Sequence, residues 1–270
     1  MRPIHFISGL PRSGSTLLSA LLRQNPRFHA SMSSPVCGLL VKLLEEMSVG
    51  NEYALFMTDE QRRRILRETV NQYYGPEYPA EVIFDTNRSW CAQLPLLHSL
   101  FPGGHLIACV RDMPWVIDSI ERLIRQNALS PSSIYNYKAG GTVYSRVDGV
   151  ARADGMVGYA YNALKEAYFG EHAQSMMLVQ YESLVSDPLR VLSAIYEFIG
   201  EPMFAHDPNN VEIGLDEFDR RAGTPGLHKV RKVVQAEQRQ TILPPDLFRR
   251  FENDAFWLQP NANLRGVTII

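Results

Sequence analysis

Short runs of apolar residues alternate along this chain with longer stretches in which apolar residues recur every three or four positions. The continuous runs predict buried strands at residues 4–8, 81–85, 105–110 and 176–180. The periodic stretches predict helices at residues 17–24, 35–49, 59–73, 89–100, 114–127, 155–170 and 188–199. Because helices follow these strands, the strands should pair in parallel with helices on both faces. The pattern therefore predicts an α/β fold of three layers (αβα), in which helices cover both faces of a central parallel sheet.

The remaining segments are less regular. Residues 128–150 are polar and aromatic and predict a long loop, which we expect to shape a substrate pocket. Residues 201–243 look mostly irregular, and a helical piece is expected near 244–256. The sequence has no internal repeat, low-complexity tract or clear linker. We therefore expect one domain over residues 1–270.

Composition narrows the possible partners and compartment. A net charge of -2 gives no reason to expect binding to nucleic acid or to a membrane surface, so any recognition of an anion must be local. No apolar run approaches the roughly 18 residues that span a bilayer. Three scattered cysteines lack the spacing of metal ligands and suggest a reducing compartment. With Met1 directly before the first strand, we expect no signal peptide and a cytoplasmic protein.

The first strand leads into a glycine-bracketed loop and then a helix. Gly9, four further residues, Gly14, Ser15 and Thr16 match the phosphate-binding P-loop at every fixed point except one, because Ser15 stands where the lysine belongs. Loop N–H groups and the helix N-terminus can hold a phosphate, and Arg12 adds a fixed positive charge. A turn without a ligand is the alternative. The missing lysine argues against ordinary nucleoside triphosphate hydrolysis.

A second candidate anion site follows another buried strand. Arg111 comes directly after the strand, and Ser119 lies eight residues later on the first turns of a predicted helix. Ligands of open α/β sheets bind at this end of the strands, and an arginine fork holds a phosphate well. The alternative is a structural ion pair of Arg111 with Asp112 or Asp118.

Together these segments resemble the sulfotransferases that use 3′-phosphoadenosine 5′-phosphosulfate (PAPS), in the bacterial and tyrosylprotein-type branch. The family's lysine-less P-loop, P-R-S-G-[ST]-T, is matched from Pro11 to Thr16, and its arginine and serine eight residues apart by Arg111 and Ser119. The segments 181–188 and 223–231 are also similar to family segments. The resemblance implies a P-loop-type fold and metal-independent, in-line transfer of a sulfuryl group from PAPS to a hydroxyl or amine.

The resemblance also assigns residues to the cofactor. It places the 5′ end at Arg12, Ser13, Gly14, Ser15 and Thr16, and the 3′-phosphate at Arg111 and Ser119 with help from Arg122 or Arg125. It further implies cofactor contacts at Tyr181, His228 and Lys229, and Arg12 with Lys229 or Lys232 would stabilise charge on the bridging oxygen. The acceptor stays open among small molecules, peptides and glycans, and so does the oligomeric state, a homodimer included.

The catalytic base does not carry over from the family. The glutamate of tyrosylprotein sulfotransferases would fall in the region of Ser33 and Ser34, which has no carboxylate. Asp85, at the end of a buried strand, is the candidate base, because partial burial can raise the pKa of a carboxyl group. Asp85 could instead cap the next helix or pair with Arg88. Weaker candidates for the base are His29, His228 and Tyr181.

Two other functions compete with sulfuryl transfer. A divergent P-loop kinase acting on a small molecule would need a cation in place of the missing lysine and an acid for Mg²⁺, for which Asp85 could serve. A nucleotide-binding protein without activity would explain the missing family glutamate. Ser15 and the spacing of Arg111 and Ser119 favour the transferase over both.

Overall fold

The computed structural model describes residues 2–48, 50–129, 132, 141–212, 214, 216–221, 223–259 and 261–270. These residues contain a six-stranded sheet in the order β2-β3-β1-β4-β5-β6, and every neighbouring pair of strands is parallel. The strands are β1 (Ile4–Gly9), β2 (Phe28–Ala30), β3 (Val82–Thr86), β4 (Leu106–Val110), β5 (Met176–Gln180) and β6 (Thr268–Ile269). The parallel sheet confirms the predicted α/β architecture.

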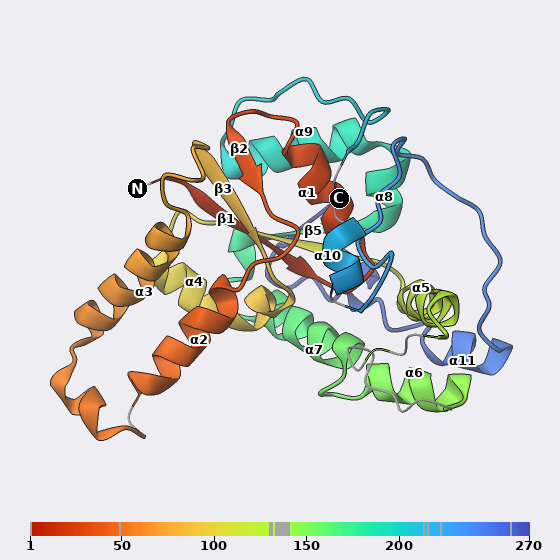
Figure 1. Ribbon diagram of the computed structural model, residues 1–270, viewed down its shortest axis with the longest axis horizontal. Coiled ribbons are helices and arrows are strands. Elements are labelled where there is room, and N and C mark those ends of the chain that lie inside the picture. The colour runs from red at the N-terminus through yellow and green to blue at the C-terminus, as the bar shows by residue number, and fades with distance from the viewer. Residues whose placement is uncertain are drawn as a thin grey trace.

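Helices cover both faces of this sheet (Figure 1). They are α1 (Ser15–Leu22), α2 (Val36–Glu46), α3 (Asp59–Tyr73), α4 (Leu94–Leu100), α5 (Met113–Gln126), α6 (Val143–Ala151), α7 (Met156–Phe169), α8 (Tyr181–Ser186), α9 (Pro188–Ile199), α10 (Asp216–Arg221) and α11 (Pro245–Arg250). Short 3₁₀ helices lie at Glu52–Phe56, Arg88–Gln93, Ala173–Ser175 and Phe256–Leu258. No helix in the described ranges is both long and apolar enough to cross a bilayer.

The sheet separates two apolar layers because successive side chains of a strand point to opposite faces. In β1, Ile7 packs with the layer that holds α1 and α9, whereas Phe6 packs with the layer formed by α2, α3, α5 and α7. In the view of Figure 1, α9 lies above the sheet and α7 below it. Burial on both faces explains why the strands read as continuous apolar runs.

Local signals in the sequence set the ends of several helices. Thr58 and Gln61 form a capping box at the start of α3, where the Thr58 hydroxyl accepts the N–H of Gln61. Asp187 caps α9 by accepting the N–H of Arg190 at 3.1 Å. Gly200 ends α9 with a φ of 73°. This left-handed conformation favours glycine.

The predicted loop over 128–150 is only partly correct. Residues 143–151 form α6, which begins where the Thr142 hydroxyl accepts the N–H of Ser145. The helix buries Val147 and Val150 and pairs Arg146 with the buried Glu121 of α5. Residues 130, 131 and 133–140, which also belong to the predicted loop, lie outside the described residues. Tertiary contacts with α5, rather than local periodicity, explain this helix.

Other boundaries differ where elements are very short. The predicted helix at 89–100 is a 3₁₀ helix over Arg88–Gln93 followed by α4, whose early Pro95 lacks the N–H that a continuous helix would need. Strands β2 and β6 span three and two residues, too few to produce a pattern in the sequence. Helices α8 and α10, six residues each, also went unpredicted for the same reason.

Candidate functional site

The P-loop joins β1 to α1 at the edge of the sheet where the parallel strands end. Gly9 and Gly14 have φ values of 106° and 98°, which a side chain would strain. A Cβ at Gly9 would also lie 2.1 Å from the carbonyl oxygen of Cys109 on β4. Arg12 has a φ of 60°, the left-handed region that residues other than glycine adopt rarely. The loop is therefore tightly bent, and Gly14 caps α1 without a side-chain hydrogen bond.

Within the loop, serine hydroxyls have different roles. The Ser13 side chain is fully buried, and its Oγ lies 2.5 Å from the carbonyl oxygen of Leu10 and 2.9 Å from that of Cys109. Its hydroxyl therefore holds the loop against β4, and Ser13 is not among the residues that line the neighbouring cavity. Ser15 and Thr16, by contrast, line a cavity in front of the helix.

This cavity has a volume of about 630 Å³ and is strongly cationic. Its walls come from the P-loop, the ends of β3 and β4, the second half of α5 (residues 119–126), α8, and the segment 224–239. Among the described residues, its cationic lining is Arg12, Arg88, Arg111, Arg122, Lys229, Arg231 and Arg239, whereas its carboxylate lining is Glu237 alone. An overall net charge of -2 thus coexists with a cavity whose charged lining is mostly cationic.

Arg111 follows β4 and its side chain is only 12% exposed. The guanidinium lies over the ring of Tyr181, with Cζ 4.0 Å from the ring centroid. Its Nε has no hydrogen-bond partner among the described residues, and the nearest carboxylate oxygen, on Glu182, is 3.7 Å away. Burial lowers the pKa of Arg111, because the charged form loses hydration. A bound phosphate would compensate for that loss.

The ion pair of Arg111 with Asp112 or Asp118, which the sequence left open, is therefore replaced by a looser contact with Glu182. The structure does bring the two predicted anion-binding elements together. The Nε of Arg12 donates to the hydroxyl oxygen of Ser119 at 3.1 Å, and a second nitrogen of Arg12 donates to the carbonyl oxygen of Leu227. P-loop, α5 and the late loop thus meet at one guanidinium, although Arg12 and Ser119 are 107 residues apart.

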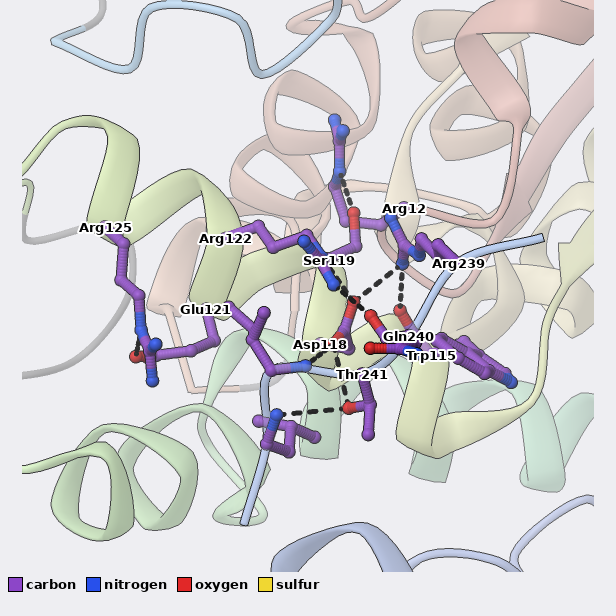
Figure 2. Close-up of polar contacts among 12 residues, drawn as sticks. Arg12, Trp115, Asp118, Ser119, Glu121, Arg122, Arg125, Arg239, Gln240 and Thr241 are labelled. Carbon is purple, nitrogen blue, oxygen red and sulfur yellow. Dashed lines mark hydrogen bonds and ion pairs between the residues drawn. The ribbon is translucent and has the colours of Figure 1, made fainter. Parts of the chain in front are cut away.

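Asp118, the neighbour of Ser119 on α5, organises the cationic side chains around it (Figure 2). It is fully buried and accepts from Arg122 at 2.9 Å and from Arg239 at 3.0 Å. It also accepts from the hydroxyl of Thr241 at 2.9 Å and the N–H of Ile242 at 2.8 Å. One carboxylate therefore fixes both arginines and ties the segment 239–242 to α5.

The structure distinguishes the two arginines expected to help at the 3′-phosphate. Arg122 lines the cavity and lies against Asp118. Arg125, one turn further along α5, pairs with Glu121 at 2.7 Å and is not among the residues that line the cavity. Figure 2 shows Arg125 directed away from the group around Asp118. Arg122 is therefore the better placed of the two.

Tyr181, His228 and Lys229 all line the same cavity as the P-loop. Tyr181 is the first residue of α8, directly after β5, and supports Arg111 as described above. His228 and Lys229 belong to the late loop at 223–229, in which Gly223 and Gly226 adopt positive φ values. Lys232, the other candidate cation, is not among the lining residues.

Asp85, the candidate base, lies elsewhere. It is fully buried at the end of β3 and does not line the cavity. Its Oδ2 accepts from the hydroxyls of Ser34 and Tyr74, each at 2.5 Å, and its Oδ1 accepts from the indole of Trp90 at 2.7 Å. Burial raises the pKa of Asp85, although these three hydrogen bonds oppose the rise.

The structure therefore gives Asp85 a packing role, because its oxygens accept from Ser34, Tyr74 and Trp90 and it lies outside the cavity lining. It forms no contact with Arg88 that would explain it as an ion pair, because its oxygens are taken by Ser34, Tyr74 and Trp90. His29, another candidate base, lies on β2 against the rings of Tyr74 and Tyr78 and does not line the cavity.

Sequence reasoning missed several residues of this site. Arg88 and Arg239 line the cavity, and Asp118 and Asp219 fix side chains and loops around it. Arg88 lies two residues after the end of β3, so its position at a strand end is a usable signal in the sequence. Arg239 lies in an irregular segment without a motif, and only its contact with Asp118, 121 residues earlier in the chain, reveals it.

Known proteins resemble this chain in sequence. The sequence model of the Sulfotransferase family matches residues 3–206, which include the P-loop, Arg111, Ser119 and Tyr181 but neither His228 nor Lys229. Protein-tyrosine sulfotransferase 1 of Danio rerio is 23% identical over 243 residues, which cover 85% of this chain. This chain spans only 61% of the length of that relative.

Solved structures are similar in fold. The sulfotransferase domain from the curacin biosynthetic pathway superposes with a TM-score of 0.51 at 17% identity, over 76% of each chain. The sulfotransferase domain of the olefin synthase from Synechococcus PCC 7002 has a TM-score of 0.46 at 21% identity, over 92% of this chain and 94% of that chain. The first of these supports the three-layer fold around a parallel sheet.

Proposed function

The chain belongs to the sulfotransferase family, and from this premise we propose that it transfers a sulfuryl group from PAPS to an acceptor hydroxyl or amine, releasing adenosine 3′,5′-bisphosphate. One observation carries the proposal. The P-loop and the partly unsatisfied Arg111 line the same cavity, so one molecule with two separated anionic groups could occupy both. PAPS carries a phosphosulfate at one end and a ribose phosphate at the other.

At the 5′ end, we propose that the loop from Arg12 to Thr16 binds the phosphosulfate. The N–H groups of Gly14 and of the start of α1 would donate to its oxygens, and the hydroxyls of Ser15 and Thr16 line the same wall. In the transfer, negative charge builds on the oxygen that leaves with the bisphosphate. The guanidinium of Arg12 would stabilise that charge without itself exchanging a proton.

At the 3′ end, we propose that Arg111 and Ser119 hold the ribose phosphate, with Arg122 and Arg239 beside them. The support is the buried Nε of Arg111 that lacks a hydrogen-bond partner among the described residues, and the anchoring of Arg122 and Arg239 by Asp118. The equivalent Nε of Arg239 is also buried without a partner there. Tyr181 would keep the Arg111 guanidinium in plane for a bidentate contact.

We propose a single domain over residues 1–270, supported by the pairing of β6, near the end of the chain, with β5 in the central sheet. A cytoplasmic location is supported by three buried cysteines that form no disulfide. The acceptor would be a small molecule, a peptide or a glycan.

The proposal is tested by ligand-induced stabilisation. Saturating adenosine 3′,5′-bisphosphate should raise the melting temperature by about 5 °C or more, since a ligand at one hundred times its Kd adds about 2.7 kcal/mol. Adenosine 5′-monophosphate, which lacks the 3′-phosphate, should stabilise less. Stabilisation by ATP with Mg²⁺ and none by the bisphosphate would favour the kinase instead and overturn the proposal.

A substitution of Arg111 tests where the 3′-phosphate binds. Arg111→Ala should bind adenosine 3′,5′-bisphosphate about 10- to 100-fold more weakly, because hydrogen bonds to charged groups contribute about 1.5–3 kcal/mol. Its affinity for adenosine 5′-monophosphate should change little. An equal loss for both nucleotides would show that Arg111 acts elsewhere than at the 3′-phosphate.

A further inference from the structure

The proposed transfer needs a group that takes the acceptor's proton, and the cavity offers few. Its described lining contains one carboxylate, that of Glu237, which pairs with Arg231 at 2.7 Å at a half-exposed position. Asp85 is outside the lining, as shown above. The arginines of the lining cannot act as bases. Among the described residues, His228 is the one histidine that lines the cavity.

His228 is held by a buried carboxylate. The Oδ1 of Asp219 lies 2.5 Å from the Nδ1 of His228, and the Oδ2 of Asp219 accepts the backbone N–H of the same residue at 2.7 Å. Asp219 is only 1% exposed. A carboxylate beside Nδ1 favours the tautomer with a proton on that nitrogen, so Nε2 is the atom able to accept a proton.

The loop that carries His228 is fixed on several sides. The N–H of Thr224 donates to the carbonyl oxygen of Asp219 at 2.9 Å, and the amide of Asn127 at the end of α5 donates to the carbonyl of Pro225 at 3.1 Å. The carbonyl of Leu227, the residue before His228, accepts from Arg12. The imidazole therefore sits in a loop attached directly to the P-loop arginine.

We propose that His228 is the general base of the transfer and that Asp219 is its positioning residue. This inference rests on the proposed function. The acceptor oxygen forms a bond to the sulfur of PAPS while the bond from sulfur to the bridging phosphate oxygen breaks, and that oxygen leaves with the electron pair on adenosine 3′,5′-bisphosphate. The acceptor proton passes to Nε2 of His228, and the resulting imidazolium, stabilised by Asp219, returns the proton to solvent.

Charged groups lie around His228, and the rate of the proposed transfer depends on whether its ring is protonated. Asp219 contacts the ring, Lys229 follows it in the chain, and Arg12 binds the carbonyl of the preceding residue. The transfer rate should fall as the pH is lowered, because a protonated imidazole cannot accept a proton.

The test measures bisphosphate release from PAPS under single-turnover conditions, with water and with a simple phenol as acceptors. His228→Gln should lower the rate about 100-fold or more while its Kd for adenosine 3′,5′-bisphosphate stays within about 3-fold, since general bases contribute 10²- to 10⁴-fold. The acid limb of the pH profile should disappear. His98→Gln, an exposed histidine on α4 outside the cavity lining, is the matched control and should change neither quantity.

Further variants separate catalysis from folding. Imidazole added to His228→Ala should restore part of the lost rate. Asp219→Asn should lower the rate about 10-fold and keep the affinity for the bisphosphate, and Asp219→Glu, which keeps the carboxylate, should recover part of the rate.

The outcomes distinguish the inference from its premise. A wild-type protein that transfers sulfuryl groups, together with a His228→Gln variant of the same rate or the same acid limb, overturns the role of His228 and leaves the proposed function intact. A variant that loses bisphosphate affinity as well as rate makes His228 a cofactor contact and also overturns it. A wild-type protein that neither binds the bisphosphate nor releases it from PAPS overturns the proposed function itself.

Discussion

Asp85 and Asp118 are both fully buried aspartates, one at the end of β3 and the other on α5, yet their surroundings differ in charge. Asp85 accepts hydrogen bonds from the neutral side chains of Ser34, Tyr74 and Trp90. Asp118 accepts from two guanidinium groups, a hydroxyl and a backbone N–H. Only the second arrangement presents cations to the cavity.

This difference shows why burial alone does not identify a catalytic carboxylate. The donors around Asp85 are neutral, so the loss of hydration on burial dominates and raises the pKa of Asp85. Asp85 thus serves to hold β3 to the segments next to α2 and α3. Two arginines can compensate a buried carboxylate charge, and Asp118 in return fixes where those arginines point. One aspartate thus supports the core, while the other supports a binding surface.

The largest expected effect is on stability, from Asp85→Ala. The substitution leaves the buried donors of Tyr74 and Trp90 without an acceptor and should lower the free energy of unfolding by about 3–5 kcal/mol. Chemical denaturation measures the loss. The folded fraction should bind adenosine 3′,5′-bisphosphate as well as wild type does, and a selective loss of that binding would break the comparison.

A smaller effect, divided between stability and binding, is expected for Asp118→Asn. Loss of the charge that holds Arg122 and Arg239 should cost about 1–3 kcal/mol of unfolding free energy and weaken bisphosphate binding about 10-fold. Calorimetric titration measures the affinity. Arg125→Ala on the same helix removes a cation that pairs with Glu121 instead, and this matched control should leave the affinity unchanged. Tighter binding by Asp118→Asn would show that its charge mainly repels the ligand.

The smallest effect is the pH dependence that Asp85 adds. Its pKa is raised in the folded protein, so the stability it contributes is full below the ordinary aspartate pKa and is lost as the pH rises toward the folded value. The advantage of wild type over Asp85→Asn should therefore shrink from about pH 4 upward, by at most about 1.4 kcal/mol per pH unit. Denaturation of both proteins at several pH values measures it. A difference that grows with pH would mean that the folded pKa of Asp85 is lowered.

The sequence predicted those parts of the fold that depend on local pattern. Continuous apolar runs identified the four longer strands because each is buried on both faces. Helix α6 was missed because its support comes from the ion pair of Arg146 with Glu121 and from the burial of Val147 and Val150. The sequence of α6 also contains Gly149, a residue type that disfavours helices, and its pattern therefore predicts a loop.

At the candidate site, motif spacing brought forward Arg12, Arg111 and Ser119, the family resemblance added Tyr181, and all four line the cavity. Spacing worked there because each of these residues lies in the loop or helix that follows a strand of the parallel sheet. It failed for Asp85, because a residue at the end of a strand can face either the cavity or the core. Only the positions of Tyr74 and Trp90 show that Asp85 faces the core.

The sequence by itself determined the P-loop, the buried strands and the spacing of Arg111 and Ser119, since each of these patterns lies in residues close together in the chain. The tertiary structure decided which side chains meet. It joined Arg12 to Ser119, Arg239 to Asp118 and, across a loop, His228 to Asp219. The physical reason is that the direction and protonation of a side chain depend on its spatial neighbours, and distant segments supply those neighbours only after the sheet and its helices have packed.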